Sequence, residues 1–421
     1  MTSENATTAT TAGTTVPAAP TDKKAWLADK LFMGLGMKAY LKTLLTPFNV
    51  IAALILIVGL PTIVYRFAAG IGAVSNLSQT NPWGIWIGLD VASGVALAAG
   101  GYTLASAVYI FNLKKYKPVA RPAILTGFLG YVFVVIGLVA DLGRPWNLWV
   151  PVVGSFGLTS VMFEVAWCVI MYATVLALEF SPAVFEWLGM KKARAWAMRV
   201  ALGLTVFGVV LSTMHQSSLG SLFLLMKGKL HPLWYSPFIP IFFFVSSIAA
   251  GLSMVIVESG ISHKAFRTQL VGEPRHDMDA ITLGLGKAAS VVLFAYFFGK
   301  LLGVAESSSW ALLSTPFGGW FLVELVGFVL VPCFAYAFAV RNRNVKLVRL
   351  TAAWTVLGIV LNRFNVSFLA FRWDQPDRYV PHWMEVVISL TIVTIGVLVF
   401  RWIVNRMPIL REHPDYRGSA H

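Results

Sequence analysis

The chain has 421 residues, of which 57% are hydrophobic and 12% charged, whereas an ordinary soluble domain carries about 25% charged residues. This composition excludes a soluble globular enzyme. A membrane-spanning helix requires about 20 apolar residues, and the chain has enough such stretches to leave no room for a folded domain outside the membrane. The formal net charge of +14 therefore reports membrane topology and does not indicate nucleic-acid binding.

The first 22 residues are rich in Ser, Thr, Ala and Pro and lack a signal-peptide pattern, so we expect them to be disordered. Residues 23–45 are basic and amphipathic. Ten apolar stretches follow, each long enough to cross a bilayer as a helix. They cover residues 47–69, 84–113, 121–141, 154–180, 198–216, 237–262, 279–304, 318–340, 346–366 and 381–403. The sequence therefore predicts an all-α integral membrane protein with about ten transmembrane helices.

The basic residues are distributed unequally between the two sides of this predicted protein. An even number of spans places both termini on one side, and 24 Lys and Arg residues lie there, against eight on the opposite side. The positive-inside rule makes the richer side cytoplasmic. We therefore expect a multi-pass protein of the cell inner membrane, with both termini in the cytoplasm and the opposite face in the periplasm.

Part of the fifth span is repeated in the ninth. Residues 205–219 and 355–369 are identical at seven of fifteen positions, at an offset of 150. Weaker matches relate the third span to the seventh, and Glu164 of the fourth span to Glu324 of the eighth. Apolar composition alone can produce some likeness, but a shared glycine argues against that explanation. We predict two parallel-repeated four-helix bundles with one further helix on each side.

This arrangement divides the chain into five parts. They are a cytoplasmic N-terminal segment (1–45), a first peripheral helix with its loop (46–83), a first four-helix bundle (84–236), a second four-helix bundle (237–366), and a last helix with a cytoplasmic tail (367–421). The second and sixth spans are rich in small residues, which let helix backbones approach closely.

Ionisable residues inside a span are costly, and each is a candidate for function. Those in the outer half of the bilayer, near the periplasmic ends of their spans, are Asp90, Glu164, Glu324 and Glu385. The residues that cap the same side are Asp141, Arg144, His215, Arg363 and His382. The inner half holds little besides Lys287 and Glu258. This asymmetry predicts a polar pocket that opens near the periplasmic face.

A quinone headgroup requires such a pocket. Its two carbonyl oxygens need hydrogen-bond donors, its reduction takes up two protons, and its tail must remain in lipid. A carboxylic acid, a histidine and a tyrosine are suitable donors and proton carriers, and Glu164, His215 and Tyr131 are the candidates. Each also has a structural explanation: Glu164 as an interhelical hydrogen-bond partner, His215 as an interfacial cap, and Tyr131 as a packing residue.

The other charged residues leave alternatives open. The turn Asp141-Leu-Gly-Arg144 is short enough for Asp141 and Arg144 to form an ion pair, which can be purely structural. Asp90 and Lys287 are candidates for a proton path, but they are equally suited to bridging helices.

We expect no metal cofactor in this chain. Cys168 and Cys333 lie inside apolar stretches and are too few to hold an iron-sulfur cluster. A b-type haem needs histidines on facing helices at matching depth, whereas only His215 and His382 approach the membrane, both at its outer edge. Any redox centres therefore belong to partner subunits.

Four motifs resemble those of the NrfD/polysulfide reductase family of quinone-interacting membrane subunits, and within it the ten-helix HybB type associated with nickel-iron hydrogenase. The motifs are Asp141-Leu-Gly-Arg144-Pro-Trp-Asn, Met162-Phe-Glu164, Ser212-Thr-Met-His215-Gln-Ser-Ser-Leu-Gly and His231-Pro-Leu-Trp-Tyr-Ser-Pro-Phe-Ile-Pro. The likeness covers nearly the whole chain after about residue 30.

The resemblance implies a haem-free quinone site near the periplasmic surface, in the first bundle. Glu164 and His215 match the acidic and histidine positions tied to quinone chemistry, and Tyr131 is a weaker match. Asp141 and Arg144 belong to the same expected quinone-binding set. Asn365 stands where the internal repeat places His215, which favours one quinone site over two. The resemblance also implies electron transfer from a periplasmic ferredoxin-like iron-sulfur subunit, with hydrogenase large and small subunits as further partners.

Together, these expectations predict that the chain is a subunit of an oxidoreductase. The subunit would pass electrons between an iron-sulfur subunit and menaquinone or ubiquinone, with His215 and Glu164 supplying protons. The residues that would extend a proton route toward the cytoplasm are Asp90, Lys287, Glu324 and Glu258. Three alternatives remain: a quinol-oxidising subunit of a molybdopterin or sulfur/nitrite reductase complex, a secondary transporter, and a plain membrane anchor.

Overall fold

The computed structural model describes residues 23–154, 157, 159–266 and 277–410. The expected disorder of residues 1–22 concerns a segment outside the described residues. The chain divides into two compact units, Met1–Ile51 and Ala52–His421. In the first unit, two short helices, α1 (Lys23–Phe32) and α2 (Met37–Leu44), precede the start of the long helix α3 (Pro47–Ala69). The site residues and the contacts between spans that are described below lie in the second unit.

In the described part of the chain, ten helical segments are long and apolar enough to cross a membrane. They are Pro47–Ala69, Trp86–Ile110, Lys114–Asp141, Val161–Leu188, Lys191–Leu224, Ile239–Ala265, Met278–Glu306, Pro316–Arg341, Val345–Leu369 and Trp383–Arg406. The described residues form no β-strand beyond one isolated bridge between Leu230 and Phe371. The prediction of an all-α protein with ten membrane-spanning helices is confirmed.

Six of these spans after α3 are continuous helices or nearly so. They contain α6 (Lys117–Asp141), α7 (Val161–Leu188), α8 (Lys191–Leu224), α9 (Ile239–Ala265), α10 (Met278–Glu306) and α14 (Trp383–Arg406). The second span is composite, with η2 (Trp86–Ser93), α4 (Gly94–Leu97), α5 (Gly100–Ala105) and η3 (Ser106–Ile110). The eighth and ninth spans are α11 (Pro316–Leu322), η9 (Val323–Leu330) and α12 (Val331–Arg341), and then α13 (Val345–Phe364) and η10 (Asn365–Leu369). The short connecting turns are η1 (Ile71–Ala73), η4 (Lys114–Tyr116), η5 (Pro145–Asn147), η6 (Val150–Gly154) and η8 (Ser309–Ser314).

The observed helix ends differ most from prediction in the fourth and fifth spans. α7 begins at Val161 and not at residue 154, and α8 continues to Leu224 beyond the predicted end at residue 216. The polar residues Ser218 and Ser221 do not end α8, because their hydroxyls donate to the carbonyls of Met214 (2.8 Å) and Ser217 (3.0 Å) within the helix.

The second and sixth spans are the most buried of the ten. Gly100 of α5 faces Gly251 of α9, where a Cβ on Gly251 would lie 2.5 Å from the Gly100 nitrogen. Only glycine permits this approach of two backbones. We call spans two to five the first bundle and spans six to nine the second bundle. The two bundles contact each other mainly through the second, fifth, sixth and ninth spans.

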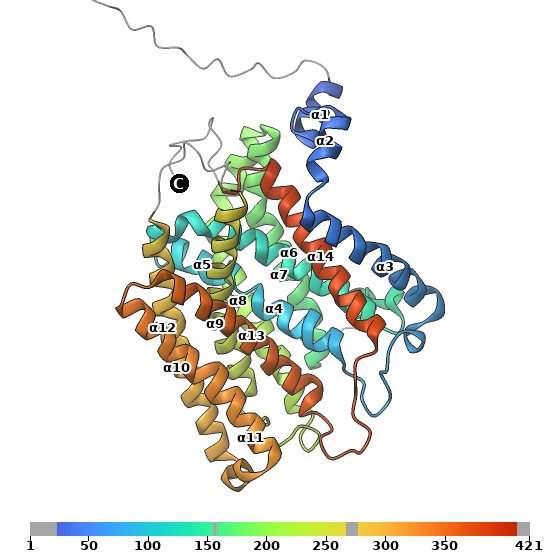
Figure 1. Cartoon of the computed structure of the whole chain (residues 1–421), viewed down its shortest axis with the longest axis vertical. Coiled ribbons are helices and arrows are strands. Elements are labelled where there is room, and N and C mark those ends of the chain that lie inside the picture. Colours follow the sequence, from blue (N-terminus) through green and yellow to red (C-terminus); the bar gives the residue numbers. More distant parts are fainter. Residues whose placement is uncertain (1–22, 155–156, 158, 267–276, 411–421) are drawn as a thin grey trace, which may run out of the picture. The chain divides into compact units, whose positions relative to one another are not determined.

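The first and last spans flank the first bundle, and α3 and α14 run side by side (Figure 1). Gly59 of α3 lies directly against Thr391 of α14. Arg66 of α3 donates to the carbonyls of Ala140 (2.7 Å) and Leu142 (2.5 Å), at the end of α6. The helices α3 and α14, which are distant in sequence, thus lie against each other beside the same end of α6.

Because each span crosses once, the connections alternate between two faces. We call one the basic face, at which α6, α8 and α13 begin and α7 and α12 end. The other, the opposite face, is where α7, α9 and α14 begin and α6, α8 and α10 end.

Candidate functional site

Three ring side chains meet in the interior of the first bundle. Tyr131 comes from the middle of α6, Tyr172 from α7 and His215 from α8, and all three are fully buried. The ring centroids of Tyr131 and Tyr172 are 4.6 Å apart, and those of Tyr131 and His215 are 5.6 Å apart. The structure thus brings together two residues predicted from the sequence, Tyr131 and His215, and adds Tyr172. With Ser212 and Gln216 of α8, these residues form what we call the tyrosine–histidine cluster.

The polar atoms of this cluster are largely unsatisfied. Those without a hydrogen-bond partner among the described residues are Tyr131 Oη, Tyr172 Oη, Ser212 Oγ, His215 Nδ1, His215 Nε2 and Gln216 Oε1. About 90% or more of buried polar groups in folded proteins are hydrogen-bonded, and an unsatisfied group costs about 1–3 kcal/mol. Such a concentration in one place indicates a site for a polar ligand or ordered water.

Two hydrogen bonds define the walls of this site. Gln216 Nε2 donates to the carbonyl of Val95 in the second span at 3.1 Å, which fixes the orientation of the amide. Tyr102 of α5 shares a hydrogen bond of 3.1 Å with Ser247 of α9. The second span and α9 therefore close the cluster on the side of the second bundle.

Glu164 lies closer to the opposite face than the cluster does. Ser218 Oγ is 2.5 Å from Glu164 Oε1 and 2.8 Å from the Met214 carbonyl. Ser218 follows His215 by three residues on α8, so Glu164 is about one helical turn from His215. The half-buried carboxyl of Glu164 thus lies between the cluster and the opposite face. Ser218 lies between Glu164 and the turn of α8 that carries His215.

The structure does not bring Asp141 and Arg144 to the tyrosine–histidine cluster. Asp141 ends α6 ten residues beyond Tyr131, about 15 Å along the helix. The expected Asp141–Arg144 ion pair is not formed among the described residues, because Arg144 is exposed beyond the helix end. Asp141 instead interacts electrostatically with Arg66 of α3.

Asp90 and Glu385 link the first bundle to α14. Ser389 donates to Asp90 Oδ2 at 2.6 Å. The Glu385 carboxylate accepts from the backbone nitrogens of Asn76 (2.9 Å) and His382 (3.0 Å) and from the Tyr379 hydroxyl. His382 itself caps α14, so these residues mainly hold the flanking helix and its loop.

In the second bundle, Glu324 occupies a closed network. Its carboxylate accepts from Trp234 Nε1 (2.7 Å), Asn362 Nδ2 (2.6 Å) and Asn365 Nδ2. The Asn365 side-chain oxygen is in turn bonded by Trp320 Nε1 at 2.9 Å. The position equivalent to His215 is thus fully hydrogen-bonded, in contrast to His215 itself.

Two buried cations accompany Glu324. Arg363 donates to Asn362 Oδ1 (2.7 Å) and Ser246 Oγ (2.8 Å) and lies over the ring of Phe243 at 3.8 Å. Lys300 lies among aromatic rings and interacts electrostatically with Glu324. Both cations are buried, including Arg363, which the sequence predicts to cap the outer side of the membrane.

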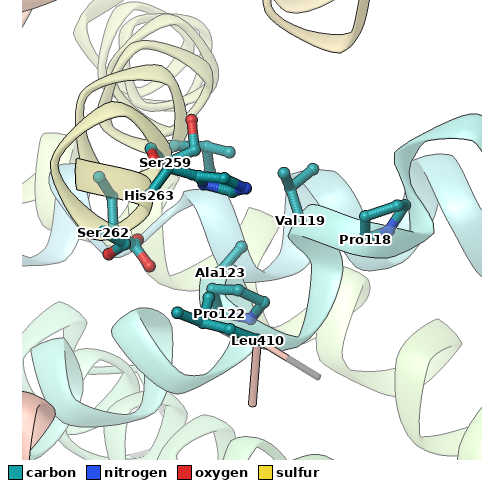
Figure 2. A pocket seen from close by; sticks show the side chains of 10 residues that line it. Pro118, Val119, Pro122, Ala123, Ser259, Ser262, His263 and Leu410 are labelled. Atoms are coloured by element: carbon teal, nitrogen blue, oxygen red, sulfur yellow. Dashed lines mark hydrogen bonds between the residues drawn. The ribbon is translucent and has the colours of Figure 1, made fainter. Parts of the chain in front are cut away.

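Glu258 lies near the basic face, between the bundles. It accepts from Thr126 of α6 at 2.7 Å, and its Oε1 has no partner among the described residues. It lines a pocket about the size of one water molecule. Figure 2 shows Ser259, Ser262 and His263 of α9 across this pocket from Val119 and Pro122 of α6. Lys287 is exposed on α10, so the four residues expected to extend a proton route lie in separate places.

Two carboxylates in the half of the first bundle near the basic face are not among the residues that the sequence predicts there. Glu179 of α7 accepts from Thr205 of α8 at 2.7 Å. Glu186 of α7 is almost fully buried and accepts from Arg121 and Arg194 at 2.8–3.1 Å. The expectation that this half holds little besides Lys287 and Glu258 is wrong. The predicted span ended at residue 180, which placed Glu179 at a helix end, whereas α7 continues to Leu188.

His231 precedes α9 in a loop of the opposite face and is enclosed by aromatic rings. It stacks on Phe317 at 4.8 Å and contacts the edge of Trp373 at 4.8 Å. Its Nδ1 accepts from the Leu233 nitrogen at 3.2 Å. Burial lowers the pKa of His231 to about 4, because the enclosure disfavours the charged ring. His231 is therefore a neutral structural residue at pH 7.

The fold and the enclosed cluster define a multi-pass α-helical membrane protein with a polar site inside a helix bundle. Residues 73–371 match the family model for polysulphide reductase, NrfD. The chain is 34% identical to the probable Ni/Fe-hydrogenase 2 b-type cytochrome subunit of Escherichia coli, over 85% of this chain and 90% of that protein. It belongs to the NrfD family of membrane subunits of respiratory oxidoreductases.

Two proteins of Nitratidesulfovibrio vulgaris are also similar. One, which has no descriptive name, is 53% identical over 90% of this chain and 98% of its own length. The other is the integral membrane subunit of a menaquinone reductase, 27% identical over 83% of this chain and 88% of its own length.

Proposed function

We propose that this chain is the haem-free, quinone-reactive subunit of a periplasm-facing respiratory oxidoreductase of nickel-iron hydrogenase type. It would pass electrons between a periplasmic ferredoxin-like iron-sulfur subunit and menaquinone or ubiquinone, as the inner-membrane partner of hydrogenase large and small subunits. Both termini would be cytoplasmic, so that the basic face lies in the cytoplasm and the opposite face in the periplasm. The names of the E. coli and menaquinone reductase relatives support this assignment.

The observation that carries the proposal is the concentration of unpartnered polar atoms in the tyrosine–histidine cluster. A quinone presents two carbonyl oxygens and no donor, so it needs hydroxyl or N–H groups that are free to donate. Tyr131, Tyr172 and His215 provide three such side chains in a fully buried site. When bound, the quinone would supply the two-electron chemistry, while these residues orient it and donate protons.

Glu164 fits the role of a proton carrier between this cluster and the opposite face. The Ser218 hydroxyl has one proton and lies near two acceptors, Glu164 and the Met214 carbonyl. When Ser218 donates to Met214, a protonated Glu164 can donate to Ser218. The carboxyl can therefore gain or lose a proton without losing its hydrogen bond.

The histidines support a haem-free assignment. His231 lies in the loop before α9, His382 caps the start of α14, and His263 lies in the last turn of α9 near the basic face. Among the described residues, none of them is therefore placed at the depth of His215 on a facing helix. Because the E. coli relative is named a b-type cytochrome subunit, an absorption spectrum of the reduced complex is a direct check. A haem band that scales with this subunit would contradict the proposal.

The test of quinone binding uses the tagged chain purified with its natural partners. A menaquinone analogue at 100 times its Kd should raise the stability of the complex by about 2.7 kcal/mol, read as a shift in melting temperature. Tyr131→Phe and Tyr172→Phe remove one hydroxyl each and should reduce both this shift and hydrogen-dependent quinone reduction. Mass spectrometry of the same sample identifies the partners. A molybdopterin or sulfur enzyme in place of hydrogenase would change the substrate, and solute accumulation by the chain alone would favour a transporter.

A further inference from the structure

Polar side chains form a line between α7 and α8 that crosses most of the first bundle. On α7, Glu164, Tyr172, Glu179 and Glu186 are eight, seven and seven residues apart. Each step is about two helical turns, so the four side chains share one face of the helix. Helix α7 packs against α8, and Glu164, Glu179 and Glu186 are each hydrogen-bonded to α8. We call this line the α7–α8 seam.

Each α7 residue of the seam has a polar neighbour on α8. Ser218 contacts Glu164 at 2.5 Å, Thr205 donates to Glu179 at 2.7 Å, and Arg194 donates to Glu186 at 2.8 Å. Tyr172 lies near Ser212, but neither hydroxyl makes a hydrogen bond of good geometry. The seam is therefore hydrogen-bonded at both ends and open at the level of the tyrosine–histidine cluster.

Glu179 stands between the cluster and the basic face. It is seven residues from Tyr172, about 10 Å along α7, and close enough to that tyrosine for electrostatic interaction. On its other side, the half-buried Tyr109 interacts electrostatically with both Glu179 and Arg121. Glu179 thus lies between Tyr172 of the cluster and Tyr109 near the basic face.

The second bundle lacks this carboxylate. The offset that relates α8 to α13 makes Thr355 the equivalent of Thr205, and the offset that relates Glu164 to Glu324 makes the buried Ala339 the equivalent of Glu179. Thr355 donates instead to the Thr351 carbonyl, at 2.9 Å. The carboxylate occurs in the bundle whose polar cluster is open and is replaced in the bundle whose network is closed.

We propose that Glu179 is the proton relay that connects the tyrosine–histidine cluster to the basic face, an inference that rests on the proposed quinone function. Quinone reduction consumes two electrons, delivered by the iron-sulfur partner, and two protons. For one of these protons, the Tyr172 hydroxyl donates to the reduced oxygen and takes a proton from Glu179 through intervening water. The resulting Glu179 carboxylate is reprotonated from the basic face. One proton per turnover is thereby taken from the aqueous phase on that side.

The experiment uses the purified complex in liposomes, with a pH-sensitive dye inside or outside and hydrogen as electron donor. In the wild type, quinone reduction should be accompanied by proton uptake from the side of the basic face. Glu179→Gln keeps the size and hydrogen bonding of the side chain but cannot carry a proton, so turnover should fall at least tenfold and proton uptake from that side should be lost. Glu179→Asp should restore most of both.

A matched pair of substitutions provides the control. Thr205→Val removes the hydrogen bond to Glu179 and should slow proton uptake severalfold, whereas Thr355→Val, the equivalent change in the second bundle, should leave it unchanged. The thermal shift with the menaquinone analogue should be retained in Glu179→Gln, which separates loss of the relay from loss of the site. If Glu179→Gln does not assemble, the two threonine variants carry the test.

Several outcomes would overturn the relay. Normal turnover with normal proton uptake in Glu179→Gln would refute it while leaving the quinone site intact. Loss of uptake in Glu258→Gln but not in Glu179→Gln would assign the route to the α6–α9 pocket. Absence of quinone turnover and of analogue binding in the wild type would refute the proposed function itself.

Discussion

Asn365 of the second bundle donates to Glu324 at the position that the internal repeat assigns to His215 in the first bundle. The two positions that the sequence repeat relates therefore differ in their hydrogen bonding. Asparagine carries both a donor and an acceptor, and both are bonded, to Glu324 and to Trp320. Histidine at the equivalent place has neither nitrogen bonded. This difference is consistent with one ligand site in the chain, in the first bundle.

Glu324 should be a determinant of stability. Glu324→Leu would remove the acceptor of three buried hydrogen bonds, from Trp234, Asn362 and Asn365. Each donor left unsatisfied costs about 1–3 kcal/mol. We expect a marked fall in the melting temperature of the detergent-solubilised complex. Glu306→Gln, at the exposed end of α10, should have almost no effect. An unchanged melting temperature in Glu324→Leu would contradict a structural role for this network.

Glu164→Gln should separate proton transfer from folding. The amide can still accept a hydrogen bond from Ser218, but it cannot exchange a proton, and loss of an acid–base group typically costs 10²–10⁴-fold in rate, so we expect about 100-fold slower quinone turnover. The complex should assemble and melt as the wild type does. Steady-state hydrogen–quinone assays measure the effect, and normal turnover would remove Glu164 from the mechanism.

Glu186 ties α7 to α6 and α8 through Arg121 and Arg194. Its side chain is 1% exposed, so Glu186→Gln should destabilise the first bundle by about 3–5 kcal/mol, with little dependence on salt. The matched comparison is the exposed pair Asp279–Arg349, 3.7 Å apart. Asp279→Asn should cost less than about 1 kcal/mol. Equal effects of the two substitutions on chemical denaturation would refute this distinction.

His231 should make stability depend on acidity. Its pKa is about 4 in the folded protein and about 6.5 in an unfolded chain. Between these values the unfolded chain binds a proton that the folded protein does not, so stability should decline as pH falls from about 6.5 to 4, by up to about 3 kcal/mol. His231→Phe should flatten this part of the melting profile. An unaltered profile in that variant would assign the acid sensitivity to other groups.

Much of the fold follows from local sequence. Ten spans, an all-α class and the approximate helix ends can be predicted because lipid requires about 20 apolar residues per span and internally satisfied backbone. The candidate site is predictable in part, since the sequence predicts Tyr131 and His215 as site residues and the structure brings their rings together. Tyr172 lies eight residues after Glu164 on the same face of α7, so helical periodicity is the signal that could identify it from the sequence.

Tertiary structure decided which polar groups meet. Arg66, far away in sequence, takes the place beside Asp141 that a local turn suggested for Arg144. Glu324 finds three donors, whereas the tyrosine–histidine cluster finds few. Composition and spacing determine that a helix crosses the membrane, because burial in lipid acts on each span separately. They do not determine its depth, its rotation or its neighbours, and hydrogen bonds between helices depend on all three.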